Sequence, residues 1–310
     1  MESKYIFWAI LLTLIYSLCY VMIKDGLVFA PPILFGGLRT LIAGVALLEY
    51  AYIQHEPLFS FGTSWKALLV LSVVGTTLVF GAMFLSPGLA GAGIASVLGN
   101  SQALITVALA AVFLGEQLSR GKATAIVLGI GGVLLIAYPS LQTSNSASIL
   151  GIGTALAAST GTAIGNVIVK RINLKRGLLA FAGWQLILGS LLLLILSGLF
   201  EEGKLVVWNM EFSGLLLFLA IVETSFPTAI WYWLVQQEDV GRLSLFFFLV
   251  PIFGLGISAM AFNEAITLVE GIGILVVLVG IGALIWEASH SSDSAFTYCP
   301  VCNTKVPLHA

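Results

Sequence analysis

The sequence has very little charge. Only 9% of its 310 residues are Asp, Glu, Lys or Arg, whereas about 25% are charged in an average soluble domain. No water-soluble globule of this size could cover its surface with so few charged side chains. Hydrophobic residues make up 59% of the chain, so the composition indicates an integral membrane protein.

Residues needed for several kinds of chemistry are also scarce. The only histidines are His55, His290 and His309, and all of them lie outside the long apolar runs. An intramembrane enzyme needs a nucleophile with a base, or a cluster of metal ligands, inside its spans, so an enzyme is not expected. Without a Gly-x-x-x-x-Gly-Lys-Ser/Thr loop, ATP is not expected as the direct energy source. Without a basic patch that contains aromatic residues, nucleic-acid binding is not expected.

Long apolar runs recur along nearly the whole chain. About 20 helical residues cross a hydrocarbon core of about 30 Å, and helices satisfy their own backbone hydrogen bonds there. The runs predict ten transmembrane helices, at about residues 5–24, 33–53, 66–86, 93–114, 122–139, 149–169, 178–199, 213–234, 243–262 and 267–287. The predicted fold class is therefore an all-α membrane protein, embedded in a lipid bilayer.

Basic residues near the ends of the spans predict the orientation, because Lys and Arg hold short loops in the cytoplasm. With the N-terminus inside, ten basic residues fall in cytoplasmic segments, and two, Lys24 and Lys204, fall on the opposite side. We therefore expect both termini in the cytoplasm and a location in the plasma (inner) membrane.

The second half of the chain repeats the register of the first. Aligning residue n with residue n+148 keeps spans 3 to 5 over spans 8 to 10 without a gap, with Thr76 over Thr224 and Glu116 over Glu264. Five spans in each half place the second half upside down relative to the first. This predicts two inverted five-helix repeats, at 1–140 and 145–288, and a cytoplasmic tail at 289–310. Inverted repeats are typical of secondary transporters, and an old duplication retained only for stability is the alternative.

Short motifs along the spans resemble the EamA family of the drug/metabolite transporter superfamily. They are Lys24, Pro31, the run Arg39 to Ala43, Trp184 with Gln185, Pro251, and the turns Gly115-Glu116 and Asn263-Glu264. The resemblance covers residues 5–287. It implies a ten-helix transporter with cytoplasmic termini that acts on amino acids, related metabolites or drugs, most often as an exporter. The tail departs from the family pattern, as does Gln102-Ala103 at the position where the second half has Val250-Pro251.

Polar residues repeat on one face of two related spans. The first span carries Tyr16, Tyr20 and Lys24, and the sixth carries Thr162 and Asn166 at positions that match under an offset of 146. Two polar stripes related by the repeat could line a solute cavity. The alternative is that the hydroxyl groups bond their own helix backbone.

Glu223 lies about ten residues into the eighth span. A carboxylate at that depth costs roughly 2.5–3.5 kcal/mol, so it should face a wet cavity or a partner. It could bind a substrate ammonium group or accept a coupling proton. The alternatives are a salt bridge to Arg39, or a shallower position if the eighth span begins later. Pro227 would free the carbonyl group of residue 223 and open the helix there. Arg39 itself could bind a substrate carboxylate or extend to the outer interface.

Two further groups complete the candidate binding residues. Trp231 could stack on a cationic or aromatic solute, whereas Tyr232 and Trp233 fit the interfacial aromatic belt. Asn100 and Gln102 lie close together in the fourth span, where at least one should bond a neighbouring helix. We expect the glycines of spans 5 and 10 to serve helix packing or a homodimer.

The tail contains Cys299 and Cys302, a pair that resembles one half of a zinc site. Zinc needs about four such ligands, so His290 and His309 could complete the site, or two protomers could share four cysteines. A disordered tail is the alternative.

The sequence as a whole predicts a secondary active exporter of small metabolites, such as amino acids, that works by alternating access. A proton or a counter-solute would drive it, and no cofactor is required. A membrane-anchored metal or metabolite sensor that acts through the tail is the alternative function.

Overall fold

The computed structural model describes residues 3–59, 64–90, 95, 98–143, 149–172, 177–201, 206–262, 267–294, 296–299 and 304–307. The helices are α1 (Ser3–Tyr16), α2 (Cys19–Gly26), α3 (Pro32–Ile53), α4 (Trp65–Leu71), η2 (Ser72–Leu78), α5 (Val79–Ala90), α7 (Gln102–Leu114), α8 (Arg120–Thr143), α9 (Ile149–Ile172), α10 (Leu178–Phe200), α11 (Met210–Ala220), η3 (Ile221–Ser225), α12 (Phe226–Gln237), α13 (Val240–Ser244), η4 (Leu245–Leu249), α14 (Val250–Phe262) and α15 (Leu268–Ser294). The predicted helical membrane protein is confirmed at this level.

Seven helical stretches among the described residues are long and apolar enough to cross a membrane. They are Ser3–Gly26, Pro32–Ile53, Trp65–Ala90, Ile149–Ile172, Leu178–Phe200, Met210–Gln237 and Leu268–Glu287. Two shorter apolar helices are Gln102–Leu114 and Val240–Gly254. All of these stretches fall on predicted spans.

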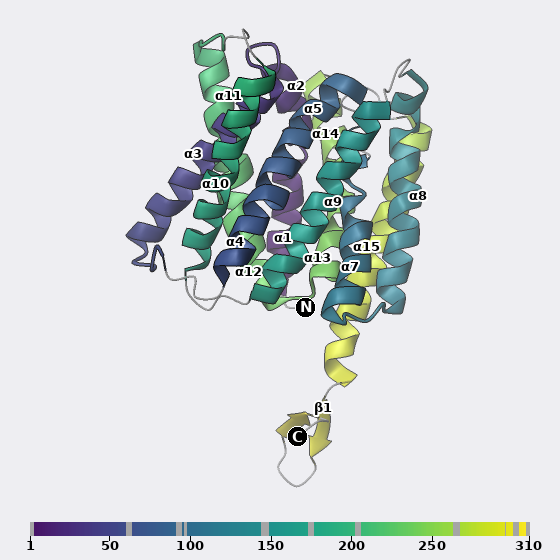
Figure 1. The fold of residues 1–310 in the computed structure, drawn as a ribbon. Helices are drawn as coiled ribbons and strands as arrows, with labels where there is room; N and C mark the ends of the chain where they lie inside the picture. Colours follow the sequence, from purple (N-terminus) through teal and green to yellow (C-terminus); the bar gives the residue numbers. More distant parts are fainter. Residues whose placement is uncertain are drawn as a thin grey trace.

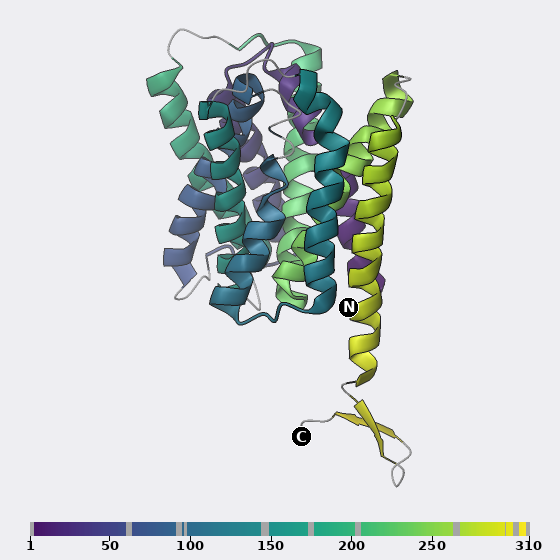
Figure 2. The same ribbon diagram turned by 90° about the vertical axis from the view of Figure 1, so that its right-hand side faces the viewer.

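The helices run side by side as one bundle (Figure 1). The start of α1 and the end of α15 lie at the same end of the bundle, which we call the tail end, and the opposite end is the far end. A view turned by 90° shows the same placement (Figure 2). Both described termini therefore emerge on one side of the bundle.

Two spans contain a stretch of wide π-helical turns. Helix η2 interrupts the span between α4 and α5, and η3 interrupts the span between α11 and α12. Pro227 follows directly after η3, within the first turn of α12. A π turn breaks the regular backbone ladder, and such turns are frequent at functional sites. The predicted opening of the eighth span near Pro227 is confirmed.

Glycine allows two pairs of antiparallel helices to approach closely. A Cβ atom added at Gly44 of α3 would lie 2.9 Å from the Gly183 carbonyl oxygen of α10, and one at Gly183 would lie 3.0 Å from the Gly44 oxygen. Helices α8 and α15 meet in the same way at Gly132 and Gly273. The packing role expected for glycines of the fifth and tenth spans is thus confirmed for Gly129, Gly132, Gly273 and Gly280, whereas an added Cβ at Gly131, Gly271 or Gly282 would meet nothing within 4 Å.

Carboxylates at opposite ends of the bundle join α3 to α10. Glu201, just after α10, accepts backbone hydrogen bonds from Ile33 and Leu34 at the start of α3, both at 2.9 Å. Glu56, just after α3, accepts one from Leu179 at the start of α10 at 3.1 Å. Each helix therefore supplies a cap for the exposed N–H groups of the other.

Beyond the bundle, the tail forms a hairpin of two short antiparallel strands, β1 (Phe296–Cys299) and β2 (Thr304–Pro307). The all-α prediction did not include these strands. They follow the C-terminus of α15 and lie outside the helical bundle (Figure 1).

Candidate functional site

A cavity of about 200 Å³ lies between the helices and receives side chains from both halves of the chain. Its polar lining residues are Tyr16, Cys19, Arg39, Asn100, Gln102, Ser159, Thr162, Asn166, Gln185, Glu223, Thr224, Thr228, Trp231 and Tyr232. One water needs only about 10–15 Å³ of such space, so the cavity has room for a small solute.

Seven of the nine candidate binding residues line this cavity. They are Tyr16, Asn100, Gln102, Thr162, Asn166, Glu223 and Trp231. Lys24 does not join them, because its side chain is exposed in the last turn of α2. The expected single face of the first span is broken by the turn at Ser17 and Leu18, which separates α1 from α2. The side chain of Tyr20 lies outside the described part of the structure.

Glu223 is the most unusual group in the cavity. It lies within η3 and is 1% exposed. Neither of its carboxylate oxygens has a hydrogen-bond partner among the described residues. A buried charge without a partner is strongly unfavourable, so this position is suited to a cationic group or a proton that arrives from the cavity.

Arg39 is buried against the same wide turn. Its Nε donates to Thr224 Oγ1 at 2.7 Å, and its Nη1 to Cys19 Sγ at 3.2 Å. Its Nη2 donates to the main-chain oxygen of Glu223 at 3.2 Å. That oxygen belongs to the carbonyl predicted to be freed by Pro227. Since the guanidinium is 1% exposed, the prediction that it could extend to the outer interface is wrong.

The guanidinium of Arg39 also packs against two aromatic rings. Its Cζ lies 5.5 Å from the ring centre of Phe80 and 5.7 Å from that of Phe84. Together with its three hydrogen bonds, these contacts fix the cation beside the cavity. Arg39 therefore positions a positive charge close to the unpaired carboxylate of Glu223, and the two side chains remain separate groups.

Trp231 and Asn166 bond each other across the cavity wall. The indole Nε1 of Trp231 donates to Asn166 Oδ1 at 2.8 Å, and Asn166 Nδ2 donates to Thr106 Oγ1 at 3.3 Å. The Trp231 ring also packs edge-on against Phe247, with centroids 5.1 Å apart. These contacts join α12, α9 and α7 and fix the indole face that lines the cavity.

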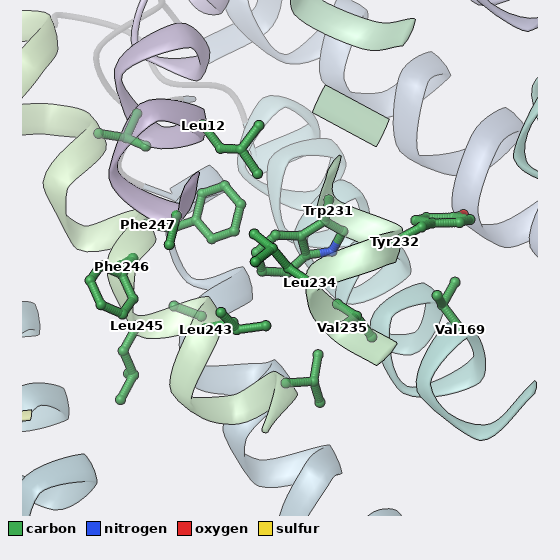
Figure 3. Packing of buried hydrophobic residues seen from close by; sticks show 14 of the residues in the cluster. Leu12, Val169, Trp231, Tyr232, Leu234, Val235, Leu243, Leu245, Phe246 and Phe247 are labelled. Carbon is green, nitrogen blue, oxygen red and sulfur yellow. The ribbon is translucent and has the colours of Figure 1, made fainter. Parts of the chain in front are cut away.

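Neighbouring Trp231 and Tyr232 leave α12 in different directions (Figure 3). The Tyr232 hydroxyl donates to Gln185 Oε1, and Gln185 Nε2 donates to Thr76 Oγ1 at 3.1 Å. Tyr232 is buried and lines the cavity, so its interpretation as an interfacial residue is wrong. The resemblance drew attention to Gln185, whereas nothing in the sequence pattern paired it with Tyr232.

Thr162 satisfies its hydroxyl within its own helix. Its Oγ1 donates to the Ala158 carbonyl oxygen at 2.9 Å. The alternative reading of the polar stripes, in which hydroxyl groups bond their own backbone, therefore holds for this residue. It still lines the cavity.

Hydrogen bonds around the cavity occur in pairs related by the internal repeat. Arg39 bonds Thr224, and Gln185 bonds Thr76. Likewise, Ser225 Oγ donates to the Ala43 oxygen at 3.1 Å, and Thr77 Oγ1 donates to the Gly189 oxygen at 3.0 Å. Residues at equivalent positions of the two bonds in each pair are 146 or 148 positions apart in the sequence, as Arg39 and Gln185 or Thr76 and Thr224 are. The two halves thus contact each other in the same way at matching positions.

A polar network lies at the tail end. The buried Lys122 at the start of α8 forms ion pairs with Glu116 at 3.1 Å and with Asp239 at 3.3 Å. Glu116 also accepts backbone hydrogen bonds from Val240 at 2.7 Å and Gly241 at 3.0 Å. Glu116 therefore accepts from the first N–H groups of α13, which lies in the other half of the chain. Its counterpart, Glu264, lies outside the described residues.

The candidate metal ligands are only partly described. Cys299 ends β1 and His290 lies in α15, whereas Cys302 and His309 lie outside the described residues. Among the described residues, no group of three or more His, Cys, Asp or Glu side chains could hold a metal ion.

Comparison with known proteins identifies the family. The profile of the EamA-like transporter family matches residues 3–138 and again residues 148–286. A probable amino-acid metabolite efflux pump of Salmonella typhimurium is 30% identical over 294 residues, which cover 91% of this chain and 94% of the pump. An uncharacterized transporter of Bacillus subtilis, YoaV, is 26% identical over 87% of this chain and 92% of its own length.

A solved crystal structure has the same fold. It superposes with a TM-score of 0.79 over 94% of this chain and 99% of its own, at 16% sequence identity. The family and these relatives are transporters and not enzymes, and the apolar helices agree with an integral membrane protein. The chain belongs to the EamA-like transporter family.

Proposed function

We propose that this transporter is a secondary active exporter of small amine-bearing metabolites, such as amino acids. The observation that carries the proposal is the buried carboxylate of Glu223, which faces the cavity without a hydrogen-bond partner among the described residues. A solute ammonium group can pair with it, and a carboxylate on the same solute would meet the positive field of Arg39. A proton or a second solute takes the same place on the return step.

Amino acids fit this cavity in both charge and size. Its volume of about 200 Å³ is below the roughly 300–1,000 Å³ of sites for drug-sized ligands, so it favours smaller solutes. Relatives from Salmonella typhimurium and Escherichia coli are named probable amino-acid metabolite efflux pumps, which supports both the solute class and export.

We infer that the chain crosses the membrane ten times, as two inverted repeats. The paired hydrogen bonds of Arg39 with Thr224 and Gln185 with Thr76 support this layout. Two wide helical turns at matching positions, η2 and η3, support it as well. In such a layout the same cavity can open to either side by rocking one half against the other.

The polar network of Lys122, Glu116 and Asp239 is suited to act as a closure at the tail end. It joins the loop before α8 to the loop before α13, which belong to different halves. Breaking it would let the halves separate at this end. Basic residues at the tail end, including Lys66, Lys170 and Arg242, support a cytoplasmic position for this end in the proposed plasma-membrane carrier.

The proposal is tested by exchange of radiolabelled solutes in proteoliposomes that contain the purified protein. A panel of amino acids and related amines is compared for the wild type, Glu223→Gln and Glu49→Gln. Removing the charge at Glu223 should lower exchange roughly 10- to 100-fold, since a bond to a charged group contributes about 1.5–3 kcal/mol. Glu49 is exposed on α3, so its variant controls for the chemical change and should exchange normally.

Saturable exchange that is equal in the wild type and in Glu223→Gln would refute the role of Glu223. Exchange of anionic solutes alone would refute the amine class. Both variants are first compared with the wild type by gel filtration, so that a folding defect is recognised.

The alternative function, a sensor that acts through the tail, makes a different prediction. Deleting residues 289–310 should leave solute exchange unchanged if the bundle is a carrier. The sensor would be favoured if this deletion abolished a cellular response to metal and no form of the protein exchanged solute.

A further inference from the structure

Two related helices begin at the wall of the cavity. Helix α7 begins at Gln102 and α14 at Val250, which are 148 positions apart, and both residues line the cavity. A turn at Asn100 and Ser101 precedes α7, and the tighter helix η4 precedes α14. Interrupted spans at matching positions of two repeats are typical of solute sites in transporters.

The start of α7 has no side-chain cap. The hydroxyl of Ser101, which precedes the helix, donates back to the Leu98 carbonyl oxygen at 2.6 Å and accepts no hydrogen bond from the first turn. The main-chain N–H of Ala103 donates to the Asn100 oxygen at 3.2 Å. Neither the main-chain N–H nor the side-chain amide of Gln102 has a partner among the described residues. A helix start with open donors carries partial positive charge and is suited to an anionic group.

The matching start of α14 offers no such donors. Residues Phe248 to Val250 stand where the first half has Asn100 to Gln102, and Pro251, at the second position of α14, lacks a main-chain N–H. Phe247 also lines the cavity, where it packs edge-on against Trp231. The cavity therefore has a polar helix start on one side and an apolar one on the other.

The same cavity also receives the carboxylate of Glu223. This side chain is 1% exposed, and its oxygens have no hydrogen-bond partner among the described residues. A cation alone would leave the donors of α7 unpaired, and an anion alone would be repelled by Glu223. A solute that carries an ammonium group and a carboxylate group would satisfy both. The charges of the cavity therefore favour a zwitterion.

Arg39 is poorly placed to bind the carboxylate of such a solute directly. Three of its N–H groups already donate to protein atoms. Its side chain is 1% exposed and packs against Phe80 and Phe84, so a solute can reach little of the guanidinium. Its positive charge attracts a carboxylate into the cavity, whereas direct hydrogen bonds have to come from another group.

We propose that the start of α7 binds the carboxylate group of an amino-acid solute whose ammonium group pairs with Glu223. The main-chain N–H and the side-chain amide of Gln102 donate to this carboxylate. The side chain of the solute then lies against Phe247 and Val250, so amino acids with apolar side chains are favoured. This subsite rests on the proposed transport function and makes its solute class more specific.

The test measures binding by titration calorimetry, with the full-length protein purified in detergent at neutral pH. The probes are leucine, leucinamide and isoamylamine, which share the ammonium group and the side chain, whereas only leucine has a carboxylate. The wild type should bind leucine roughly 10- to 100-fold more tightly than the other two.

Gln102→Leu removes the amide at nearly constant volume. The ratio of leucine affinity to isoamylamine affinity should fall about tenfold in this variant. Gln117→Leu is the matched control, because Gln117 is exposed in the loop after α7 and its variant should keep the wild-type ratio.

A second variant, Ser101→Asp, places a carboxylate at the start of α7. Asp stabilises a helix in this position, so the variant should fold, and its carboxylate should occupy the donors that the solute needs. The preference for leucine over isoamylamine should disappear.

Equal affinity of the wild type for leucine and isoamylamine would overturn the subsite, as would an unchanged ratio in both Gln102→Leu and Ser101→Asp. Neither result concerns the ammonium site. That site is tested by Glu223→Gln, which should weaken the binding of isoamylamine as well as leucine. Wild-type affinity of Glu223→Gln for isoamylamine would contradict the transport proposal even if the preference for leucine were present.

Discussion

At the scale of single residues, the cavity combines one charged side chain that has hydrogen-bond partners with one that has none among the described residues. Arg39 has three hydrogen bonds and two aromatic neighbours, whereas the carboxylate of Glu223 has no hydrogen-bond partner among the described residues. Arg39 donates to the backbone of Glu223 and holds the wide turn that directs this residue. The cation therefore has a positioning role in addition to its charge.

Tyr232→Phe tests the buried hydrogen bond to Gln185. Removing the hydroxyl leaves Gln185 Oε1 without its donor, so the free energy of unfolding should fall by about 1 kcal/mol. The measurement is reversible unfolding in mixed micelles. Tyr52→Phe is the control, because Tyr52 is exposed and its variant should match the wild type. Equal stability of all three proteins would show that this bond contributes nothing.

Sequence reasoning found most polar residues of the cavity but few of their partners. Glu223 and Asn166 stand out because polar groups inside apolar runs need a reason to be there. Which group bonds Asn166 depends on how distant helices pack, and no spacing in the sequence reveals that it is Trp231. The failure at Lys24 has a local cause, since a break of two residues between α1 and α2 destroys the helical phase.

At the scale of elements, close helix pairs depend on glycines that face each other. Helix α8 lies against α15 with Gly132 and Gly273 in reciprocal contact, and α3 lies against α10 through Gly44 and Gly183. Lipid tails are as apolar as leucine, so packing and backbone approach supply the attraction between such helices.

Gly132→Val tests the α8–α15 contact. A Cβ at this position would lie 2.7 Å from the Gly273 oxygen and 2.4 Å from a methyl group of Val277, so the helices must separate. We expect a loss of about 1–3 kcal/mol of stability, measured as a lower unfolding temperature in detergent. The adjacent Gly131→Val is the control, because no atom lies within 4 Å of its added Cβ. Equal losses in both variants would point to helix propensity and not to the contact.

The helices themselves follow from the apolar runs, and the predicted spans agree with the seven long apolar stretches. Of the two wide turns, the sequence predicts only η3, because Pro227 follows it directly. Helix η2 contains no proline, so its wide turn depends on packing contacts such as that of Thr77 with Gly189. The tail hairpin was missed because four-residue strands leave almost no periodic pattern.

At the scale of the whole molecule, the tail end is held together by charges that come from both halves. Lys122 is almost fully buried between Glu116 and Asp239, and loss of its charge would leave two carboxylates close together. Under the proposed alternating access, opening of the cavity toward this end requires these contacts to break.

Lys122→Met should therefore favour the state that is open at the tail end. The buried Cys19 lines the cavity and can report on this, in a protein whose Cys299 and Cys302 are replaced by serine. A membrane-impermeant thiol reagent added from the tail side should label Cys19 several times faster in Lys122→Met. Lys66→Met is the control, because Lys66 is exposed at the same end. Labelling that is unchanged by Lys122→Met would show that closure resides elsewhere.

The repeat-related contacts are alike in geometry and unlike in charge. Arg39 of the first half matches Gln185 of the second, and Glu223 of the second half matches Gly75 of the first. The two open states of the proposed carrier are therefore not equivalent by the repeat symmetry, and a solute entering from one face meets the charged wall in a different order than one entering from the other. Half-saturation for the solute should differ between the two faces, although the gradients alone decide which way it finally moves.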